Sequence, residues 1–362
     1  MKIFQVIQKP QARGVELFTS LLSEELVNQG HEVILISIFE GEFVLPFTGR
    51  QIHLNRPLKN RLWDWKAWKS FADLVKKESP DIIQANAGDT LKFTVLSRLF
   101  FGWKVPVIFR NASLISSYIS HFWIKQYNEF LLNQVEGIVS VSQTAQEDMR
   151  SFFKLNKPEL LVIPIGVETR LQSMCSPKEG KRELVHIGGF TFEKNHGELL
   201  DIFQRLSDKD PSFRLILIGE GPLWNQVKAE VKARNLENQV EFFGNVGQPF
   251  SHISKNAILL LPSTIEGLPG VILEAMLHQI PVIAYGVGGI PEVLRNGETG
   301  WCVPPQNTNA FVKAIQEVLT MDNEQKMVIL KQAYQMVSTN YSLSQISLLF
   351  EQFYRSLLST NK

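Results

Sequence analysis

The sequence predicts an α/β protein made of two doubly wound domains, each built on a parallel sheet. Short apolar, β-branched runs alternate with amphipathic helical patterns along the whole chain, which is typical of βαβ units. The runs are too many for one ordinary sheet, and 362 residues are enough for two domains. Hydrophobic residues make up 44% and charged residues 20% of the chain, which is the composition of a folded globular protein.

The expected elements follow this alternation. Strands are predicted at residues 2–7, 32–38, 81–85, 105–109, 137–142 and 161–163, and then at 183–188, 213–219, 238–243, 257–261, 281–284 and 300–303. Helices are predicted at residues 15–29, 64–78, 89–101, 117–133, 143–154, 194–207, 223–235, 270–279, 307–320, 323–340 and 342–360. The polar stretch 169–181 reads as a linker, so we expect domains at 1–170 and 171–340 and a separate C-terminal helix at 341–362.

Several protein classes are not indicated. No apolar run reaches the roughly 18–20 residues that a membrane-spanning helix needs, and the N-terminus lacks the pattern of a signal peptide. Cys175 and Cys302 cannot form a disulfide framework or a zinc cluster, so we expect the reducing cytoplasm. A net charge of +1 gives no indication of nucleic-acid binding.

Ligands of doubly wound sheets bind beyond the carboxyl ends of the strands, so the loops after the strands are the candidate site. After the first strand, Gly14 precedes a helix and allows a ligand to approach the free amides, although a plain tight turn explains it equally simply. After strand 183–188, Lys194 lies near a helix start, where a cation is unfavourable unless an anion is close; a solvated lysine is the alternative. His196 is expected to be a surface or capping residue.

The loop after strand 257–261 is the most informative. Glu266 and Glu274 are eight residues apart, with Gly267 and Pro269 between them. Pro269 fits a helix start, so Glu266 precedes the helix and Glu274 lies inside it among apolar residues. Two carboxylates can thus border one site, and a ribose diol suits one of them. A surface glutamate pair is the alternative, which the apolar surroundings of Glu274 disfavour.

The loop after strand 281–284 contains Gly286, Gly288 and Gly289 ahead of a short helix, which is a second backbone cradle for phosphate oxygens. Glu292 is expected near that helix start, where it could be merely structural. Together the loops predict a nucleotide-diphosphate ligand in a cleft between the two domains.

At this point the chain resembles the retaining GT-B glycosyltransferases of glycosyltransferase family four, the glycosyl transferases group 1. The strongest match is the E-x7-E stretch EGLPGVILEA at 266–275, and supporting matches are ARGVE, VSVSQTAQEDM, VIPIGVE, EKNH, LIGEGP, VEFFGNV and NGETGW. The resemblance covers nearly the whole chain. It implies the GT-B fold, with two Rossmann-like domains facing a cleft and the C-terminal helix crossing back to the first domain.

The resemblance also implies residue roles. Lys194 and Glu266 would carry catalysis: Lys194 would neutralise the donor diphosphate, and Glu266 would contact the donor sugar. Glu274 would hold the ribose hydroxyls. The remaining donor-binding positions would be Gly14, Gly189, Gly244, Asn245, Gly267, Leu268, Pro269 and Gly289.

The chain departs from the family pattern at several positions. Gly189 stands where the family's G-R-L-x-x-E-K stretch often has an arginine that binds the diphosphate, and Ile165 replaces the usual asparagine of the P-N-G-V-D stretch. Asn86 and Asn111 stand where histidines are often found, so acceptor roles do not transfer directly. Asn86, Asp89, Arg110 and Asn111 are therefore the predicted acceptor side.

No metal is expected at the site. The only D-x-D sequence, Asp208 to Asp210, precedes Pro211 in a polar turn rather than following an apolar strand. Retention of the sugar's configuration in this family is usually explained by front-face attack, in which the leaving phosphate takes the proton of the acceptor hydroxyl. This mechanism demands no protein base. No cofactor is predicted.

The segment 50–77 carries eight basic and two acidic residues together with Trp63, Trp65 and Trp68. A mixed helical stripe is made by Leu62, Trp65, Trp68 or Lys69, Ala72 and Val75, so the tryptophans can be core residues. The alternative is a surface patch that touches anionic lipid or a lipid-diphosphate acceptor, joined by Phe100, Phe101 and Trp103.

The favoured function is transfer of a sugar from a UDP- or GDP-sugar to a glycan or lipid-linked acceptor, in surface polysaccharide synthesis, in the cytoplasm or at the inner face of the membrane. The alternative is a non-catalytic GT-B partner subunit that binds glycan or a second glycosyltransferase; Gly189 and Ile165 favour it, and the intact Glu266, Glu274 and Lys194 disfavour it. A nicotinamide dehydrogenase is disfavoured because GxGxxG is missing.

Overall fold

The computed structural model describes residues 1–61, 63–176 and 180–360. Leu62 of the predicted helical stripe and residues 177–179 of the predicted linker lie outside this description. The chain divides into two compact units: unit 1 contains residues 1–166 and 343–362, and unit 2 contains residues 167–342. Each unit is an α/β domain around a parallel sheet, which confirms the predicted fold class.

Unit 1 has a seven-stranded sheet in the order β3-β2-β1-β4-β5-β6-β7. Its strands are β1 (Lys2–Ile7), β2 (Glu32–Phe39), β3 (Arg50–Arg56), β4 (Ile82–Ala85), β5 (Val107–Asn111), β6 (Gly137–Ser140) and β7 (Glu159–Val162). Its α-helices are α1 (Gly14–Asn28), α2 (Trp65–Glu78), α3 (Gly88–Phe101), α4 (Phe122–Leu132), α5 (Gln143–Phe152) and α12 (Leu343–Thr360), and short 3₁₀ turns lie at η1 (Leu58–Asn60) and η2 (Ile115–Tyr118).

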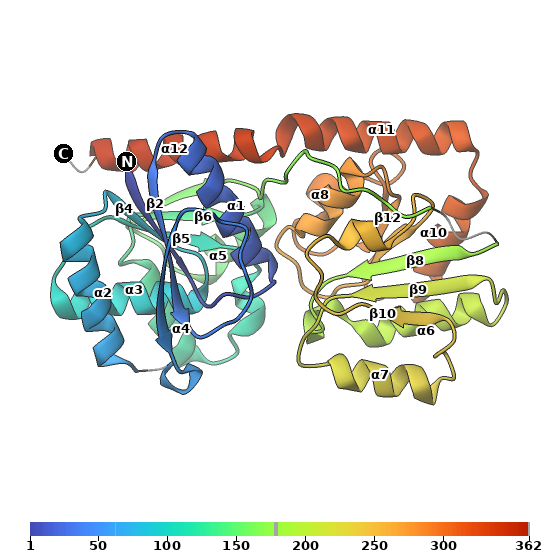
Figure 1. Ribbon diagram of the computed structural model, residues 1–362, viewed down its shortest axis with the longest axis horizontal. Coiled ribbons are helices and arrows are strands. Elements are labelled where there is room, and N and C mark those ends of the chain that lie inside the picture. The colour runs from blue at the N-terminus through green and yellow to red at the C-terminus, as the bar shows by residue number, and fades with distance from the viewer. Residues whose placement is uncertain (62, 177–179, 361–362) are drawn as a thin grey trace. The chain divides into compact units, whose positions relative to one another are not determined.

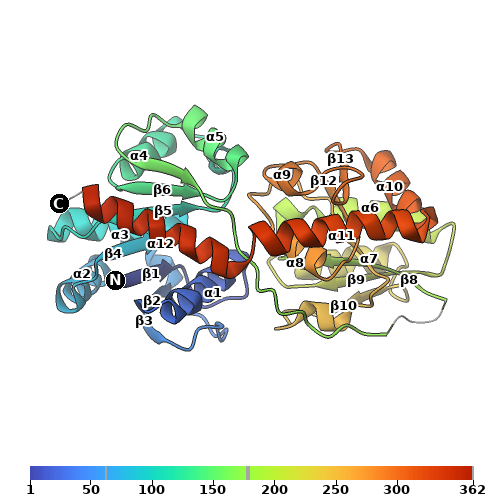
Figure 2. The same cartoon turned by 90° about the horizontal axis from the view of Figure 1, so that it is seen from above.

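Helices cover both faces of this sheet. The side chains of Val6, Ile83 and Phe109 pack with α2 and α3 in one buried cluster. The opposite face is covered by α1 and α12, whose Phe18 and Phe350 rings lie 6.1 Å apart (Figures 1 and 2). Because both faces of the sheet are buried, most strands are near-continuous apolar runs in the sequence, and these runs located most of the strands.

Unit 2 has a six-stranded parallel sheet in the order β10-β9-β8-β11-β12-β13. Its strands are β8 (Arg182–Ile187), β9 (Phe213–Ile218), β10 (Val240–Phe242), β11 (Ile258–Leu261), β12 (Val282–Tyr285) and β13 (Trp301–Val303). Its helices are α6 (His196–Ser207), α7 (Trp224–Ala233), α8 (Gly270–Leu277), α9 (Ile290–Val293), α10 (Thr308–Thr320) and α11 (Asn323–Asn340), with 3₁₀ turns at η3 (Phe192–Lys194) and η4 (Pro249–His252).

Local signals fix several helix boundaries. Asp64 and Ser142 cap α2 and α5, each by accepting a hydrogen bond from a backbone N–H three residues later. Asn307 and Asp322 cap α10 and α11 in the same manner. Gly102 ends α3 in the left-handed conformation that a glycine adopts without strain.

Two sequence-based expectations were wrong. Strand β3 was not predicted, because RQIHLNR is polar and only partly buried at the edge of the sheet, so it lacks the apolar run of the inner strands. The helix predicted at 117–133 begins only at Phe122, because the preceding residues form the separate turn η2. Within the described residues, no helix combines the length and apolarity needed to cross a membrane.

A buried hydrogen-bond network joins α12 to the sheet of unit 1. The Tyr354 hydroxyl donates to Gln84 Oε1 at 2.7 Å and accepts from Gln5 Nε2 at 3.2 Å. Asn86 Nδ2 donates to Gln5 Oε1, and Gln84 Nε2 donates to Asn86 Oδ1. All four side chains are fully buried, so each polar atom depends on these partners.

Replacing Tyr354 by phenylalanine is expected to destabilise unit 1 by about 1–3 kcal/mol, because Gln5 and Gln84 lose their common partner in a buried site. Urea unfolding followed by circular dichroism measures the change. The matched control is Tyr334→Phe in α11, a half-buried tyrosine with no hydrogen bond among the described residues, which is expected to change stability by less than about 0.5 kcal/mol. Equal effects of the two substitutions would contradict the role of the network.

Candidate functional site

The predicted donor residues of unit 2 occupy the carboxyl edge of its sheet. The chain builds this sheet outward from β8 on one side and from β11 on the other, so the loops after β8 and β11 diverge at a switch point. Lys194 belongs to the loop after β8, and Glu266 belongs to the loop after β11. The two side chains therefore flank the position where doubly wound sheets bind their ligands.

Lys194 and Glu266 form an ion pair across this switch point. Lys194 Nζ lies 2.5 Å from Glu266 Oε1, and the two side chains are 19% and 9% exposed. The helix predicted to start at Lys194 starts two residues later, since Asn195 adopts a left-handed conformation with φ of +53°. Lys194 thus projects from a 3₁₀ turn ahead of α6, where it neutralises a mostly buried carboxylate.

Direct hydrogen bonds hold the loops after β8 and β11 together. The Thr264 N–H donates to the Glu193 carbonyl at 2.8 Å, and Asn195 Nδ2 donates to the Pro262 carbonyl at 3.3 Å. These bonds fix the backbone on either side of the ion pair. The position of Lys194 relative to Glu266 is therefore fixed by the backbone of both loops and not by the flexible lysine side chain alone.

The glycine loop after β12 packs on the Glu266 loop. The Gly289 N–H donates to the Gly267 carbonyl at 2.7 Å. Gly288 has φ of +55°, and a Cβ at this position would overlap the Glu266 carbonyl oxygen. Close backbone approach is therefore the physical reason for glycine at 288, and it brings Glu266, Gly267 and Gly289 into one assembly.

Glu274 is a half-buried carboxylate inside α8, whereas Glu266 precedes this helix, whose N-cap is Pro269. Within the described residues the side-chain carboxylate of Glu274 has no hydrogen-bond or ion-pair partner, although the neighbours Leu273 and Ala275 are buried. Burial, reinforced by the nearby Glu168 carboxylate, raises the pKa of Glu274 to about 7. An unpartnered carboxylate in such surroundings can accept hydrogen bonds from a ligand.

The loops after β9 and β10 extend the same edge. Asn245 Nδ2 donates to Glu220 Oε2 at 3.2 Å, and the Gly219 N–H donates to the Gly244 carbonyl at 2.8 Å. Gly244 has φ of +63°, so its conformation favours glycine. Glu220, within the LIGEGP stretch, was not among the predicted site residues; its place directly after a buried strand was the available signal.

Two buried histidines, His186 and His196, lie near Lys194. The expectation that His196 is a surface or capping residue was wrong: it is 2% exposed, and its ring stacks on Phe190 with centroids 4.2 Å apart. Burial, reinforced by the charge of Lys194, lowers the pKa of His196 to about 4. Burial also lowers the pKa of His186, whose Nδ1 lies 2.8 Å from the Leu260 carbonyl. Both rings are neutral at pH 7, so they add no positive charge beneath the lysine.

In unit 1 the switch point lies between β1 and β4, and the loops after these strands lead to Gly14 at the start of α1 and to Asp89 in the first turn of α3. Gly14 is the first residue of α1, and a Cβ there would meet no atom within 4 Å. Gln8 Nε2 donates to Asp89 Oδ2 at 2.5 Å and bridges the two loops. Asn86, in contrast, directs its side chain into the buried Gln5–Gln84 network.

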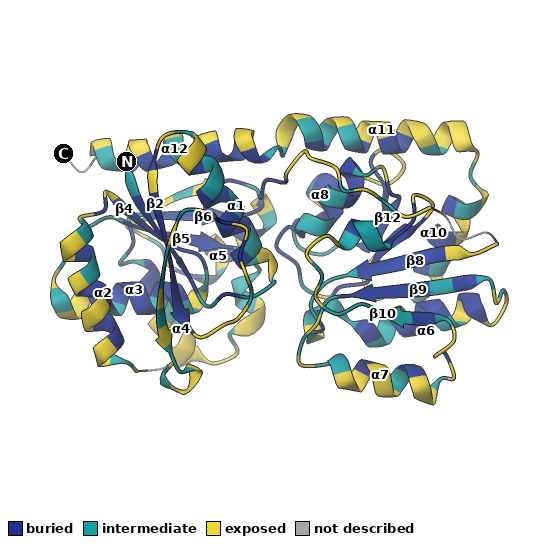
Figure 3. Ribbon diagram, in the orientation of Figure 1, coloured by how far each residue is buried: buried dark blue, intermediate teal, exposed yellow. Residues whose placement is uncertain are grey.

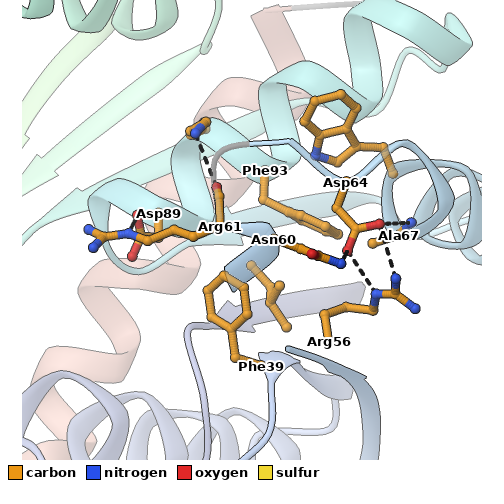
Figure 4. A pocket seen from close by; sticks show the side chains of 11 residues that line it. Phe39, Arg56, Asn60, Arg61, Asp64, Ala67, Asp89 and Phe93 are labelled. Carbon is orange, nitrogen blue, oxygen red and sulfur yellow. Dashed lines mark hydrogen bonds and ion pairs between the residues drawn. The ribbon is translucent and has the colours of Figure 1, made fainter. Parts of the chain in front are cut away.

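A small pocket opens beside Asp89 (Figure 4). Arg61 Nε pairs with Asp89 Oδ1 at 2.7 Å, and Arg56 Nε pairs with Asp64 Oδ2 at 2.8 Å. The aromatic side chains of Phe39 and Phe93 contribute to the wall. This pocket lies between β2, η1 and α3; its two arginines already have carboxylate partners, and Lys92 Nζ donates to the Arg61 carbonyl at 3.1 Å.

Arg110 and Glu16 form a second charged group at this edge of unit 1. Arg110 is 1% exposed, and its guanidinium lies 4.2 Å from the Phe18 ring centroid. Within the described residues its Nε and Nη1 have no hydrogen-bond acceptor. Burial lowers the pKa of Arg110 to about 10 and raises the pKa of Glu16 to about 7. Glu16 was not predicted as a site residue, although it lies in the ARGVE stretch. Asn111, which follows Arg110 in the chain, donates from its side chain to the Ala145 carbonyl at 3.4 Å.

Over the described part of the chain, no three His, Cys, Asp or Glu side chains gather in a group that could hold a metal ion. Of the D-x-D residues, Asp208 follows α6, and Asp210 pairs with Arg182 at 3.1 Å. Neither lies in the loops at the carboxyl edge of the sheet described above.

Substituting alanine for Gly288 is expected to destabilise unit 2 by about 1–3 kcal/mol, since the positive φ and the overlap with the Glu266 carbonyl both oppose a Cβ. Thermal and urea unfolding measure the effect. Gly197→Ala in α6 is the matched control, because its Cβ would meet only a side-chain atom at 4.0 Å, and alanine favours a helix. A Gly288→Ala variant as stable as this control would contradict the close approach.

Comparison with known proteins follows the same division of the chain. The family model of glycosyltransferase family 4 matches residues 12–171, and that of glycosyl transferases group 1 matches residues 173–336. The chain is 24% identical over 375 aligned positions to N-acetyl-alpha-D-glucosaminyl L-malate synthase of Bacillus anthracis, with 98% of this chain and 96% of the relative covered. It is 23% identical to the amylovoran biosynthesis glycosyltransferase AmsD of Erwinia amylovora, with 86% and 88% covered.

The fold agrees with these relatives. The crystal structure of Anabaena HepE in complex with UDP and glucose superposes with a TM-score of 0.82 at 18% identity, covering 98% of this chain and all of that one. The relatives give no support to the alternative of a non-catalytic partner subunit. The chain belongs to the group 1, family 4 glycosyltransferases and is a glycosyltransferase with the GT-B fold.

Proposed function

We propose that the protein is a retaining glycosyltransferase that takes its sugar from a nucleotide-diphosphate sugar. The observation that carries this proposal is the Lys194–Glu266 pair at the switch point of unit 2, with the unpartnered Glu274 in the adjoining helix. A cation, a sugar-binding carboxylate and a ribose-binding carboxylate are what an activated sugar requires. UDP is the proposed nucleotide, because the structurally similar HepE was solved with UDP and glucose.

The reaction needs positive charge where the leaving diphosphate develops negative charge. Lys194 supplies this charge, and amides around Gly189, Leu268 and Gly289 are proposed to add hydrogen-bond donors. Glu266 accepts from hydroxyls of the donor sugar, while its contact with Lys194 keeps the cation in place before the donor binds. Glu274 accepts from the ribose hydroxyls, and Gly244 and Asn245 border the base.

The acceptor is proposed to bind unit 1, on the side of Asp89, Arg110 and Asn111. A glycan or lipid-linked saccharide of surface polysaccharide synthesis is the first candidate, in keeping with the amylovoran glycosyltransferase among the relatives. Asn86 supports this edge through its buried network rather than by a free amide. That Gly14 and the unit 2 loops border one cleft remains a prediction.

A small anionic acceptor is the second candidate. The buried guanidinium of Arg110, with two nitrogens lacking acceptors among the described residues, favours a carboxylate or phosphate on the acceptor. The malate synthase relative is named for such an acceptor. An acceptor panel that includes L-malate and neutral saccharides, with UDP release as the readout, separates the two candidates.

Lys194→Ala is expected to lower turnover at least a hundredfold, because removal of one preorganised electrostatic donor costs about 2.7–4 kcal/mol of transition-state stabilisation. Release of UDP from a panel of UDP-sugars measures it. The matched control is Lys209→Ala, an exposed lysine in the turn after α6, which is expected to retain the parental rate. Near-normal turnover of Lys194→Ala would remove Lys194 from its role.

The affinity for UDP is expected to fall about tenfold between pH 8 and pH 6. Ribose hydroxyls bind the ionised Glu274 carboxylate, whose pKa in the free protein is about 7, above the ordinary 4.5. Below pH 7 the Glu274 carboxyl must therefore lose a proton before the ribose binds, and each further unit by which the pH is lowered weakens the binding more. Calorimetric titration with UDP across this range measures the dependence.

The Glu274→Gln variant serves as the reference for this pH series. UDP titrates in the same range, and this variant retains the nucleotide's own contribution while losing that of the carboxylate. The difference between the two proteins is the contribution of Glu274. Identical pH dependences would show that Glu274 does not receive the ribose.

A further inference from the structure

Helix α4 directs its apolar face toward solvent. Trp123, Tyr127 and Phe130 recur at i, i+4 and i+7 on one side of the helix and are 80%, 40% and 49% exposed. Phe122 and Ile124 beside them are also exposed, and only Leu131 and Leu132 of this helix are buried (Figure 3). A helix on the surface of a globular protein normally turns its apolar face to the core and its polar face to solvent. The exposed stripe of α4 therefore indicates an apolar partner.

A second aromatic group lies on the same side of the sheet. Trp63 and Trp65 lie at the start of α2, and each ring contacts Phe100 at the end of α3, with centroids 5.9 and 5.1 Å apart. All three are exposed, whereas Trp68 is buried, so Trp68 is a core residue and the contact of Trp63 and Trp65 with lipid stays a prediction. Helix α3 contacts both α2 and α4, and these helices lie opposite α1 and α12 (Figures 1 and 2).

Basic side chains accompany these rings. Lys59, Lys66 and Lys69 are exposed along η1 and α2, whereas the charge of Arg61 between these elements is balanced by Asp89. On α4, Lys125 Nζ lies 4.7 Å from the ring centroid of Phe152 in α5, so this lysine turns toward α5 rather than toward the apolar stripe, and the basic side chains of this side come from η1 and α2. This side of unit 1 therefore combines exposed aromatic rings with positive charge.

This combination distinguishes between possible partners. The centres of protein–protein interfaces are enriched in aromatic residues but depleted in lysine. Surfaces that lie in the headgroup region of a membrane combine Trp, Tyr and Phe with Lys and Arg, because the rings are amphipathic and the cations attract anionic lipid. An 11-residue helix is too short to cross a bilayer but long enough to lie in its interface.

We propose that the outward face of α4 inserts into the headgroup region of an anionic membrane, assisted by the basic and aromatic residues of η1, α2 and the end of α3. The proposal extends the surface expected from residues 50–77 to a helix that the sequence did not single out. It concerns membrane binding alone and does not depend on the donor or acceptor of the transfer reaction. A membrane-bound enzyme would meet lipid-linked acceptors at the surface where they reside.

Cosedimentation of the full chain with vesicles tests the proposal. Vesicles of equal parts phosphatidylglycerol and phosphatidylcholine are expected to bind the protein, and vesicles of phosphatidylcholine alone are expected to bind it less. The triple variant Trp123→Ser, Tyr127→Ser, Phe130→Ser is expected to lower the partition coefficient at least about tenfold, because three aromatic rings lose their burial in lipid. Lys66→Glu with Lys69→Glu is expected to weaken binding to the anionic vesicles only.

The matched control is the pair Met327→Ser and Val328→Ser on α11 of unit 2, which removes exposed apolar side chains elsewhere and is expected to leave binding unchanged. Circular dichroism and thermal unfolding verify that each variant is folded. Absence of parental binding at low salt, or undiminished binding of the triple variant, overturns the proposal. A parental dimer that the triple variant converts to a monomer, with vesicle binding unchanged, would assign the face to a second copy of the chain instead.

Discussion

The proposed donor site of this protein depends on the joining of three loops at the carboxyl edge of the unit 2 sheet. Each loop follows a different strand, and parallel strands bring their ends together without fixing the loops. Backbone bonds from Thr264 to Glu193 and from Gly289 to Gly267 supply the fixation. Lys194 and Glu266 can then meet at a defined distance, because their backbones are already tied to each other.

Charge at this edge is arranged by burial. Neutral His186 and His196 lie below Lys194, so the lysine is the cation of that group, and Glu266 balances it. Glu274 has no such balance, and burial makes its ionised form costly in the free protein. One carboxylate is thus held in place by the chain, and the other is available to a ligand. This edge of the sheet therefore combines the ion pair of Lys194 and Glu266 with the Glu274 carboxylate, which can accept hydrogen bonds.

The sequence predicted features that depend on local pattern. Apolar runs located the inner strands, and the placement of Pro269 separated Glu266 from the helix of Glu274. Strand β3 escaped detection because edge pairing needs no apolar run. His196 and Glu16 escaped because polar residues give no sign of burial until the tertiary contacts form. The outward stripe of α4 reads in sequence like any amphipathic helix, since periodicity reports that a face exists but not which way it points.

The path of the chain through unit 1 has a consequence for its synthesis. The chain leaves this unit after Gly166 and returns only at Leu343, so unit 2 is an insertion within it. Gln5 and Tyr354 are 349 residues apart, yet they share a hydrogen bond. On the ribosome, the inserted unit can fold while the earlier one still waits for its final helix. The first residues to emerge are therefore among the last to reach their native partners, and a chaperone that shields the face of β1 and β4 that α12 later covers would act on this unit.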